Sequence, residues 1–277
     1  MKKAFLAAVL AAVFISGCAA SSDTITVISR EDGSGTRGAF VELMGIESDG
    51  VDNTTVNAEI SQSTSVVITS VEGNKNAIGY ISLGSLNDTV KAIKVDGVEA
   101  TVENIKNGTY AVSRPFNIAY KDDTLSELSR DFISYIMSAD GQAIIEKSGC
   151  IKISENGAAY TPSGLTGTIK LGGSTSVAPV MEKLAEAYKA LNAGVEITIE
   201  QTGSSAGMTS AIEGLCDIGM ASRDVKQSEL DGGLTAETIA LDGIAVIVNK
   251  ENSVSNLTSE QIKNIYVGDV TLWSEVQ

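Results

Sequence analysis

The chain has 277 residues, of which 43% are hydrophobic and 20% charged, a composition typical of one large or two small globular domains. Its formal net charge is −15 and it carries no basic stripe, which argues against a nucleic acid as a partner. It contains no histidine, which excludes Ser-His and Cys-His catalytic pairs and histidine metal sites. We therefore expect no metal and no cofactor.

The N-terminus has the pattern of a secretory signal peptide. Lysines precede an apolar stretch over residues 4–15, and Cys18 follows a Ser-Gly pair. This ending resembles the lipobox of bacterial lipoproteins, in which the cysteine becomes the acylated N-terminus. A buried helix with an incidental cysteine is the alternative. We predict a signal peptide over 1–17, a lipid on Cys18, a tether over 18–23 and an extracytoplasmic, membrane-anchored protein.

The next part of the chain alternates strand and helix patterns. The periodicity predicts strands over 24–30 and 77–82, helices over 38–44 and 63–71, a strand and turn over 90–98, an extended segment over 110–120, and one long helix over 125–147. Because Pro115 lies inside the extended segment, we expect that segment to be an edge strand or a chain crossing.

Residues 154–167 form the clearest linker, since they are rich in Gly, Ser and Pro and poor in large apolar residues. Strand patterns follow over 168–171, 195–200, 217–219 and 241–249, and helix patterns follow the first two of them. A last helix starts after Thr258, with Gln261 in the capping-box position. This alternation predicts α/β layers.

Hydroxyl-rich loops join several of these strands to the helices that follow. They are Gly33–Thr36, Gly172–Pro179 and Gly203–Ser205. Such a loop presents backbone N–H groups, hydroxyl donors and the positive end of a helix dipole. Taken singly, each loop is best explained as a helix cap or a turn. Their shared order and spacing favour helix N-termini that converge on one anion.

Cys150 and Cys216 lie far apart and have no CxxC spacing, so they do not predict a metal cluster. They are either free thiols or one disulfide. Nothing in the sequence brings them together, which favours two buried thiols.

These loops and the strands between them resemble the phosphate-binding protein of the bacterial phosphate ABC transporter, over nearly all of the chain after Ser22. The segments that carry the resemblance are 27–37 (VISREDGSGTR), 77–84 (AIGYISLG), 171–184 (LGGSTSVAPVMEKL), 201–207 (QTGSSAG), 216–223 (CDIGMASR) and 241–249 (LDGIAVIVN). The resemblance implies a two-lobed α/β fold of the periplasmic-binding-protein type II kind, with the ligand in the cleft between the lobes.

The order of the segments departs from that family, in which the GSTS-type loop lies near the mature N-terminus and the GSGT loop follows. The segment ending at Gln277 runs, in the family, directly into the strand that here begins at Thr24. The resemblance therefore implies a circular permutation, in which the linker joins the family's usual ends. A truncated tandem or a misjoined gene is the alternative. A permuted chain should hold Gln277 and Thr24 close together in the same lobe.

The implied chain crossings lie near residues 110–115 and 248–251. One lobe is then built from residues 24–112 plus 250–277 and carries the GSGT loop. The other is built from residues 113–249 and carries the GSTS and GSS loops.

The resemblance also implies which residues bind phosphate. One lobe would contribute Arg30, Ser34, Gly35 and Thr36, and the other Thr175, Ser176, Ser204 and Ser222. Arg30 would supply a charged fork for two phosphate oxygens, with Asp32 holding it in place. Arg37 and Arg223 are candidates for supporting or rim charges.

Ser222 is a second position at which the chain departs from the pattern of that family. Well-known members of the family have an aspartate there, which accepts a proton from phosphate and helps to reject sulfate. This chain has a serine hydroxyl in its place, so the selectivity among tetrahedral oxyanions stays open. Asp32 and Asp224 are the nearest carboxylates in sequence that could accept the proton instead.

The resulting functional expectation is a non-catalytic solute-binding protein that captures inorganic phosphate and delivers it to an ABC permease. One alternative is a binding protein for another tetrahedral oxyanion or a phosphate ester. Another is a sensory or adhesion lipoprotein of the same fold that has lost the ligand. A serine hydrolase using Ser34 or Ser204 would need a Ser-Lys pair, and no SxxK motif lies at these loops.

Overall fold

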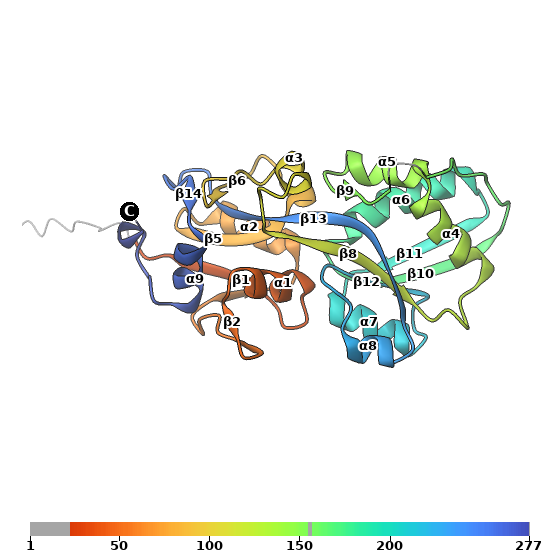
Figure 1. The fold of residues 1–277 in the computed structure, drawn as a ribbon, viewed down its shortest axis with the longest axis horizontal. Helices are drawn as coiled ribbons and strands as arrows, with labels where there is room; N and C mark the ends of the chain where they lie inside the picture. Colours follow the sequence, from red (N-terminus) through yellow and green to blue (C-terminus); the bar gives the residue numbers. More distant parts are fainter. Residues whose placement is uncertain (1–22, 155–156, 277) are drawn as a thin grey trace, which may run out of the picture.

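The computed structural model describes residues 23–154 and 157–276, so the predicted signal peptide and Cys18 lie outside the described residues. Figure 1 shows two lobes side by side, with two long strands running between them. One mixed sheet continues through both lobes in the order β11-β10-β12-β8-β13-β5-β1-β4.

The first lobe contains both ends of the described chain. Its strands are β1 (Thr26–Arg30), β2 (Glu47–Ser48), β3 (Val51–Asp52), β4 (Glu59–Ser61), β5 (Ala77–Ser82), β6 (Val90–Ala92), β7 (Lys94–Val95) and β14 (Asn256–Leu257). Its helices are α1 (Gly35–Leu43), α2 (Thr64–Gly73), α3 (Val102–Lys106) and α9 (Ser259–Val267), with short 3₁₀ turns η1 (Leu83–Ser85) and η2 (Trp273–Glu275).

The second lobe is formed by the middle of the chain. Its strands are β9 (Ile151–Lys152), β10 (Gly167–Gly173), β11 (Val195–Glu200) and β12 (Ile218–Ala221). Its helices are α4 (Glu127–Met137), α5 (Ala139–Lys147), α6 (Ala178–Leu191), α7 (Ser204–Ile212) and α8 (Gln227–Asp231). The crossing strands are β8 (Ser113–Tyr120) and β13 (Thr235–Asn249).

Strand β13 changes partner where it passes from lobe to lobe. Residues 235–243 pair with β8, and residues 244–248 pair with β5. The second crossing therefore lies near residues 241–244 and not at 248–251. The expected boundary after Asn249 is wrong because the apolar side chains from Ile244 to Val248 pack into the cores of the first lobe.

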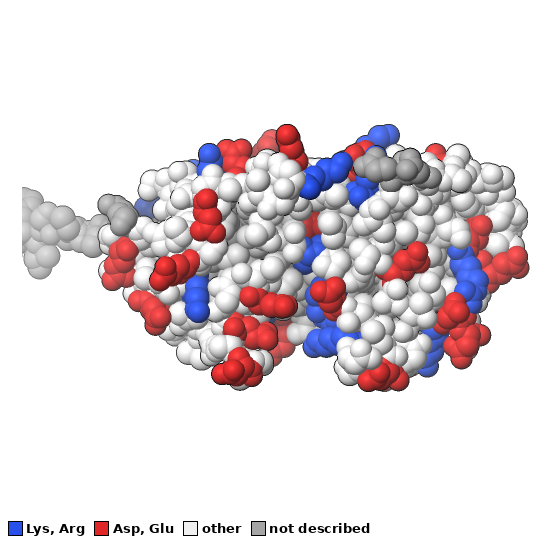
Figure 2. Space-filling view, viewed as in Figure 1, with Lys and Arg blue, Asp and Glu red and all other residues white. Residues whose placement is uncertain are grey.

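Charge is unevenly spread over the surface. Figure 2 shows Asp and Glu scattered over both lobes, whereas several Lys and Arg side chains lie along the boundary between them. The boundary thus carries several positive side chains although the net charge is −15.

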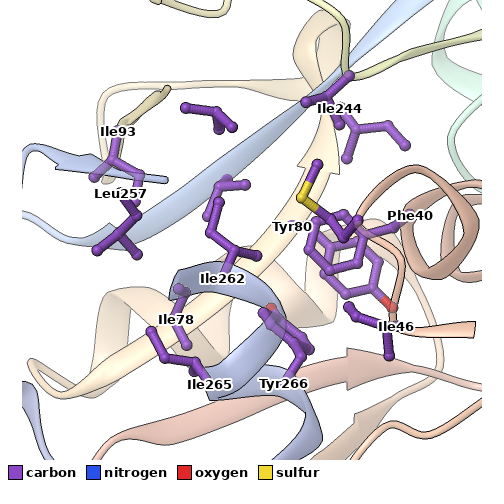
Figure 3. Close-up of a cluster of buried hydrophobic side chains, with 14 of the residues drawn as sticks. Phe40, Ile46, Ile78, Tyr80, Ile93, Ile244, Leu257, Ile262, Ile265 and Tyr266 are labelled. Atoms are coloured by element: carbon purple, nitrogen blue, oxygen red, sulfur yellow. The ribbon is translucent and has the colours of Figure 1, made fainter. Parts of the chain in front are cut away.

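The core of the first lobe reaches the end of β1. Phe40 stacks on Tyr80 with ring centroids 3.9 Å apart, and Tyr266 packs edge-on against Phe40 (Figure 3). The buried hydroxyl of Tyr80 lies 2.9 Å from the Ser29 hydroxyl and accepts a hydrogen bond from the backbone N–H of Arg30. Aromatic packing thus fixes the backbone of Arg30.

The single helix predicted over 125–147 is wrong, because the chain forms α4 and α5 with a break at Ser138. Ser138 is extended (φ −70°, ψ 167°), and its side chain caps α5 by accepting from the Gly141 N–H. A Cβ on Gly141 would lie 2.2 Å from the Tyr135 carbonyl oxygen, so this close approach of the helices requires glycine.

The segment that contains Pro115 was expected to be either an edge strand or a chain crossing. Strand β8 is a chain crossing. It lies between β12 and β13. Since β12 pairs only with residues 117–119 of β8, no strand of residues 23–154 and 157–276 lies opposite Pro115 on that side.

The predicted linker is packed against the second lobe in its described part. Tyr160, Ser163 and Tyr188 all donate their hydroxyl protons to the same carboxylate oxygen of Asp131, at 2.5–2.9 Å. The Tyr160 ring also contacts the rings of Tyr135 and Tyr188.

The two ends of the described chain meet in the first lobe. Thr24 forms an antiparallel bridge with Leu272, and the Ile25 N–H donates to the Thr271 carbonyl at 2.8 Å. A circular permutation requires such adjacency but is not demonstrated by it, and Gln277 lies outside the described residues. The permutation stays a prediction.

Cys150 and Cys216 are both free thiols, the first buried and the second partly buried. No helix within the described part of the chain has the length and apolar character needed to span a bilayer. The residues described also bring together no group of three or more His, Cys, Asp or Glu side chains suited to a metal ion.

Gly207 sets how closely α7 approaches β10, and replacing it tests this packing. A Cβ there would lie 2.4 Å from the Gly172 carbonyl oxygen, so we predict that Gly207→Ala lowers the free energy of unfolding by about 1–3 kcal/mol. The matched control is Gly73→Ala at the end of α2, where a Cβ would meet nothing within 4 Å. Urea unfolding measures both, and equal stabilities of the two variants would contradict the packing argument.

Candidate functional site

A cluster of buried hydroxyl groups lies where the two lobes meet. Thr36 and Thr64 come from the first lobe, and Thr175, Ser176, Ser204 and Ser222 from the second. Each of these residues, which we call the hydroxyl cluster, is at most 5% exposed.

Hydrogen bonds connect the hydroxyl cluster across the lobe boundary. The Thr36 hydroxyl lies 2.9 Å from that of Ser176 and 3.3 Å from that of Ser222. The Thr64 hydroxyl lies 3.1 Å from that of Ser176 and 3.3 Å from that of Thr175. The cluster is therefore a point of direct contact between the lobes.

The hydroxyl cluster is built from the starts of helices. Thr36 is the second residue of α1, Thr64 the first of α2 and Ser204 the first of α7, while Thr175 and Ser176 lie just before α6. The first backbone N–H groups of a helix have no partner within it, and its dipole is positive at that end. These N-termini together make an environment that favours an anion.

Glycine allows the closest approach of the lobes. A Cβ on Gly35 would lie 2.4 Å from the Ser204 hydroxyl oxygen and 2.8 Å from that of Ser222. Next to it, the Ser205 N–H donates to the Gly33 carbonyl at 3.1 Å. A side chain on Gly35 would therefore push the hydroxyls of the second lobe away from α1.

Arg30 is the charged residue at the centre of the cluster, and it is only 2% exposed. Its guanidinium donates to the Thr175 hydroxyl at 3.0 Å and to the Thr64 hydroxyl at 3.4 Å. Its Nε and one terminal nitrogen also bind the two carboxylate oxygens of Glu31, each at 2.7 Å. This bidentate geometry holds the planar guanidinium in one orientation.

Glu31, and not Asp32, therefore holds Arg30 in place, so the expectation for Asp32 is wrong. The chain turns directly after β1, with the Ser34 N–H donating to the Glu31 carbonyl and Gly33 at φ +83°. A residue at the tip of such a turn faces solvent. The Asp32 side chain is 98% exposed and pairs with Arg37 at 2.7 Å.

The other predicted residues lie around the cluster. The Ser34 hydroxyl caps α1 by accepting from the Arg37 N–H. Arg37 pairs with Asp52 at 2.7 Å and donates to the Arg30 carbonyl at 2.9 Å.

Arg223 binds both carboxylate oxygens of Glu229, at 2.7 and 3.0 Å, and donates to the Ser205 hydroxyl. Arg37 and Arg223, with Ser34 and Ser205, line a cleft of about 480 Å³ beside the cluster. Both arginines are thus charges at the rim of the site.

Sequence reasoning missed Thr64, although a signal for it was present. Thr64 follows β4 in a Ser-Gln-Ser-Thr run, which has the strand–hydroxyl-loop–helix pattern of the other loops. The pattern was not recognised because β4 is only three residues long.

The buried pair Arg114 and Asp242 was missed as well. Arg114 is 3% exposed, donates to the Thr36 hydroxyl at 3.2 Å and lies 3.1 Å from a carboxylate oxygen of Asp242. Burial raises the pKa of Asp242 to about 6, against the opposing effects of Arg114, Ser82 and the Gly84 N–H. The signal was the charged residue Asp242 at the start of an apolar run.

The hydroxyl cluster presents hydrogen-bond donors suited to an anion. The hydrogen bonds of the hydroxyl cluster run to other hydroxyls, to backbone N–H groups and to Arg30 and Arg114, with no carboxylate or lysine among the described partners. A serine nucleophile needs an adjacent base. Such a set of donors suits a tetrahedral oxyanion.

Known proteins are similar to this chain over most of its length. A family model described as a PBP superfamily domain matches residues 8–140 and 158–277. A protein named phosphate-binding protein PstS 2 from Streptococcus agalactiae is 50% identical over 272 residues, which cover 95% of this chain and 92% of that protein. One of the same name from Streptococcus pneumoniae is 47% identical, with coverage of 93% and 89%.

A solved structure supports the same comparison. The crystal structure of a phosphate ABC transporter, phosphate-binding protein from Streptococcus pneumoniae matches with a TM-score of 0.73 and 47% identity. The match covers 92% of this chain and 100% of that one.

Proposed function

Because the chain belongs to the PstS-like family of phosphate-binding proteins, with the mixed α/β fold of the periplasmic-binding-protein superfamily, we propose that it captures inorganic phosphate between its lobes and delivers it to an ABC permease. It acts outside the cytoplasm, as phosphate ABC transporter binding proteins do. Its predicted lipid on Cys18 would keep it at the membrane surface, which mass spectrometry of the membrane-extracted protein tests directly.

The observation that carries this proposal is the hydroxyl cluster around Arg30. A phosphate dianion removed from water needs a donor for each lone pair, since an unpartnered buried charge is very costly. We assign the ligand to Arg30, Gly35, Thr36, Thr175, Ser176, Ser204 and Ser222, with Ser34 as the cap of α1 and Thr64 as an added donor. Both lobes then contribute to one anion.

A hydrolase is not supported by the geometry of its candidate nucleophiles. The Ser204 hydroxyl accepts from the Ser222 N–H, and the Ser34 hydroxyl accepts from the Arg37 N–H. Each is therefore engaged as an acceptor of a backbone proton, with no base beside it among its described partners. The protein is proposed to bind and release its ligand unchanged.

Calorimetric titration with phosphate, sulfate, molybdate and a phosphate ester tests this function. Wild-type protein is expected to bind phosphate, and Arg30→Ala is expected to weaken binding at least tenfold, because a hydrogen bond to a charged group contributes ~1.5–3 kcal/mol. The matched control is Arg130→Ala, since Arg130 is half-exposed and pairs with Asp122 away from the cluster. An unchanged dissociation constant in Arg30→Ala would mean that phosphate binds elsewhere on the protein. Binding of another anion in place of phosphate would mean that this anion is the ligand.

Ser222 generates a prediction about selectivity. Only a ligand O–H can donate to a carboxylate, so an aspartate at this position would demand a protonated ligand and repel sulfate. Both oxygens of Glu31 are bound by Arg30, while Asp32 and Asp224 are exposed. We therefore expect the wild type to bind dibasic phosphate without a proton requirement and to reject sulfate less sharply than Ser222→Asp.

Competition binding at mildly alkaline pH measures this difference. The prediction is wrong if the wild type already rejects sulfate completely and Ser222→Asp does not sharpen the choice.

A further inference from the structure

Arg114 is a buried cation that the proposed ligand set does not include. It lies on β8 directly opposite Asp242 on β13, where both strands pass between the lobes. Its guanidinium reaches out of the crossing strands to the Thr36 hydroxyl at 3.2 Å. We propose that Arg114 is a positioning residue for the anion: it fixes the Thr36 hydroxyl so that the hydroxyl proton is donated to bound phosphate. This inference rests on the proposed function.

The direction of the Arg114–Thr36 bond follows from the chemistry of the two groups. A guanidinium only donates hydrogen bonds, whereas a hydroxyl has one proton and two lone pairs. The Thr36 oxygen must therefore accept from Arg114, which leaves its proton for a partner on the other side. That side faces the hydroxyls of Ser176 and Ser222, within the proposed anion site.

Arg30 acts in the same way on other hydroxyls of the cluster. It donates to the hydroxyls of Thr64 and Thr175, so these oxygens also accept from a guanidinium. The two arginines thus orient hydroxyls from both lobes as donors. Such an arrangement favours a fully deprotonated oxyanion, which offers only acceptors.

The surroundings of Arg114 indicate that a contribution to fold stability does not by itself explain why a cation is buried at this position. Its Nε is buried without a hydrogen-bond partner, and its Nη1 forms the 3.1 Å ion pair with an Asp242 oxygen without the alignment of a hydrogen bond. The other Asp242 oxygen accepts from the Ser82 hydroxyl and the Gly84 N–H, and lies 4.0 Å from the Cys150 sulfur. A buried ion pair is often no more stabilising than well-packed apolar residues of similar volume.

Because Arg114 belongs to the crossing strands, it anchors Thr36 to the part of the sheet that both lobes share. The guanidinium also lies over the Phe116 ring, 5.2 Å from its centroid, which limits its movement. The orientation of the Thr36 hydroxyl is therefore set before the ligand arrives, which lowers the cost of binding.

A double-mutant cycle with phosphate titration tests this role. Arg114→Met should weaken phosphate binding on the order of fivefold to tenfold when Thr36 is present, as expected for one lost charge-assisted hydrogen bond. In a Thr36→Val background the same change should alter the dissociation constant less than about twofold. Arg130→Met is the matched control and should bind phosphate like the wild type.

The other outcomes of the double-mutant cycle distinguish the role of Arg114 from the proposed function. Equal weakening in both backgrounds overturns the proposal, since a purely structural or long-range charge effect does not depend on Thr36. Unchanged binding in Arg114→Met overturns it too, while phosphate binding by the wild type leaves the proposed function intact. No binding by the wild type overturns both.

A second variant keeps the test valid if Arg114→Met fails to fold, because that change leaves Asp242 buried without its cation. Replacing the pair together, as Arg114→Met with Asp242→Asn, removes both charges and keeps an oxygen that accepts from the Ser82 hydroxyl and the Gly84 N–H. The double variant should keep the wild-type melting temperature within a few degrees and still lose phosphate affinity on the order of fivefold to tenfold. A folded double variant with wild-type affinity contradicts the proposal.

Discussion

The proposed binding site depends on the burial of one positive charge, that of Arg30, between two lobes. Burying a guanidinium is costly unless its donors find acceptors, and Glu31, Thr64 and Thr175 accept from Arg30. Because Thr64 and Thr175 belong to different lobes, satisfying Arg30 also brings the lobes together. The helix starts that surround it then place their N–H groups and hydroxyls around the same point. Tyr80 extends this constraint into the aromatic core, since its hydroxyl binds the Arg30 backbone.

The crossing strands connect this site to the architecture. Strand β13 pairs with β8 in one lobe and with β5 in the other, so the sheet is continuous through the boundary. Arg114 and Asp242 lie opposite each other at that crossing, and Arg114 contacts the cluster through Thr36. The fold therefore supplies cations from two directions, one from the end of a strand in the first lobe and one from the strands shared by both lobes. An acidic protein can hold an anion in this way, because the local charges outweigh the distant, screened carboxylates.

Features with a local signal could be predicted from the sequence. Strands β5 and β11 begin and end where their residue patterns indicate, and the Thr258–Gln261 capping box starts α9 as expected. The loops after β1 and β10 were recognised because a change of period from strand to helix brackets them. Features that depend on non-local geometry were not predictable. Glu31 replaces Asp32 as the partner of Arg30 because of the turn at Gly33, and Arg114 meets Asp242 only through the register of β8 with β13. The break at Ser138 likewise depends on how Gly141 packs against α4.

We propose that one tetrahedral anion is held inside the hydroxyl cluster, by both lobes at once. A crystal structure of the protein grown with arsenate tests it most directly, because arsenic scatters anomalously and its position does not depend on interpreting a peak as water or sulfate. We expect one dominant arsenic peak between Arg30, Thr36, Thr175 and Ser204, with the oxygens within hydrogen-bonding distance of donors from both lobes. An arsenic peak at the rim beside Arg223, or one that contacts a single lobe only, would contradict it.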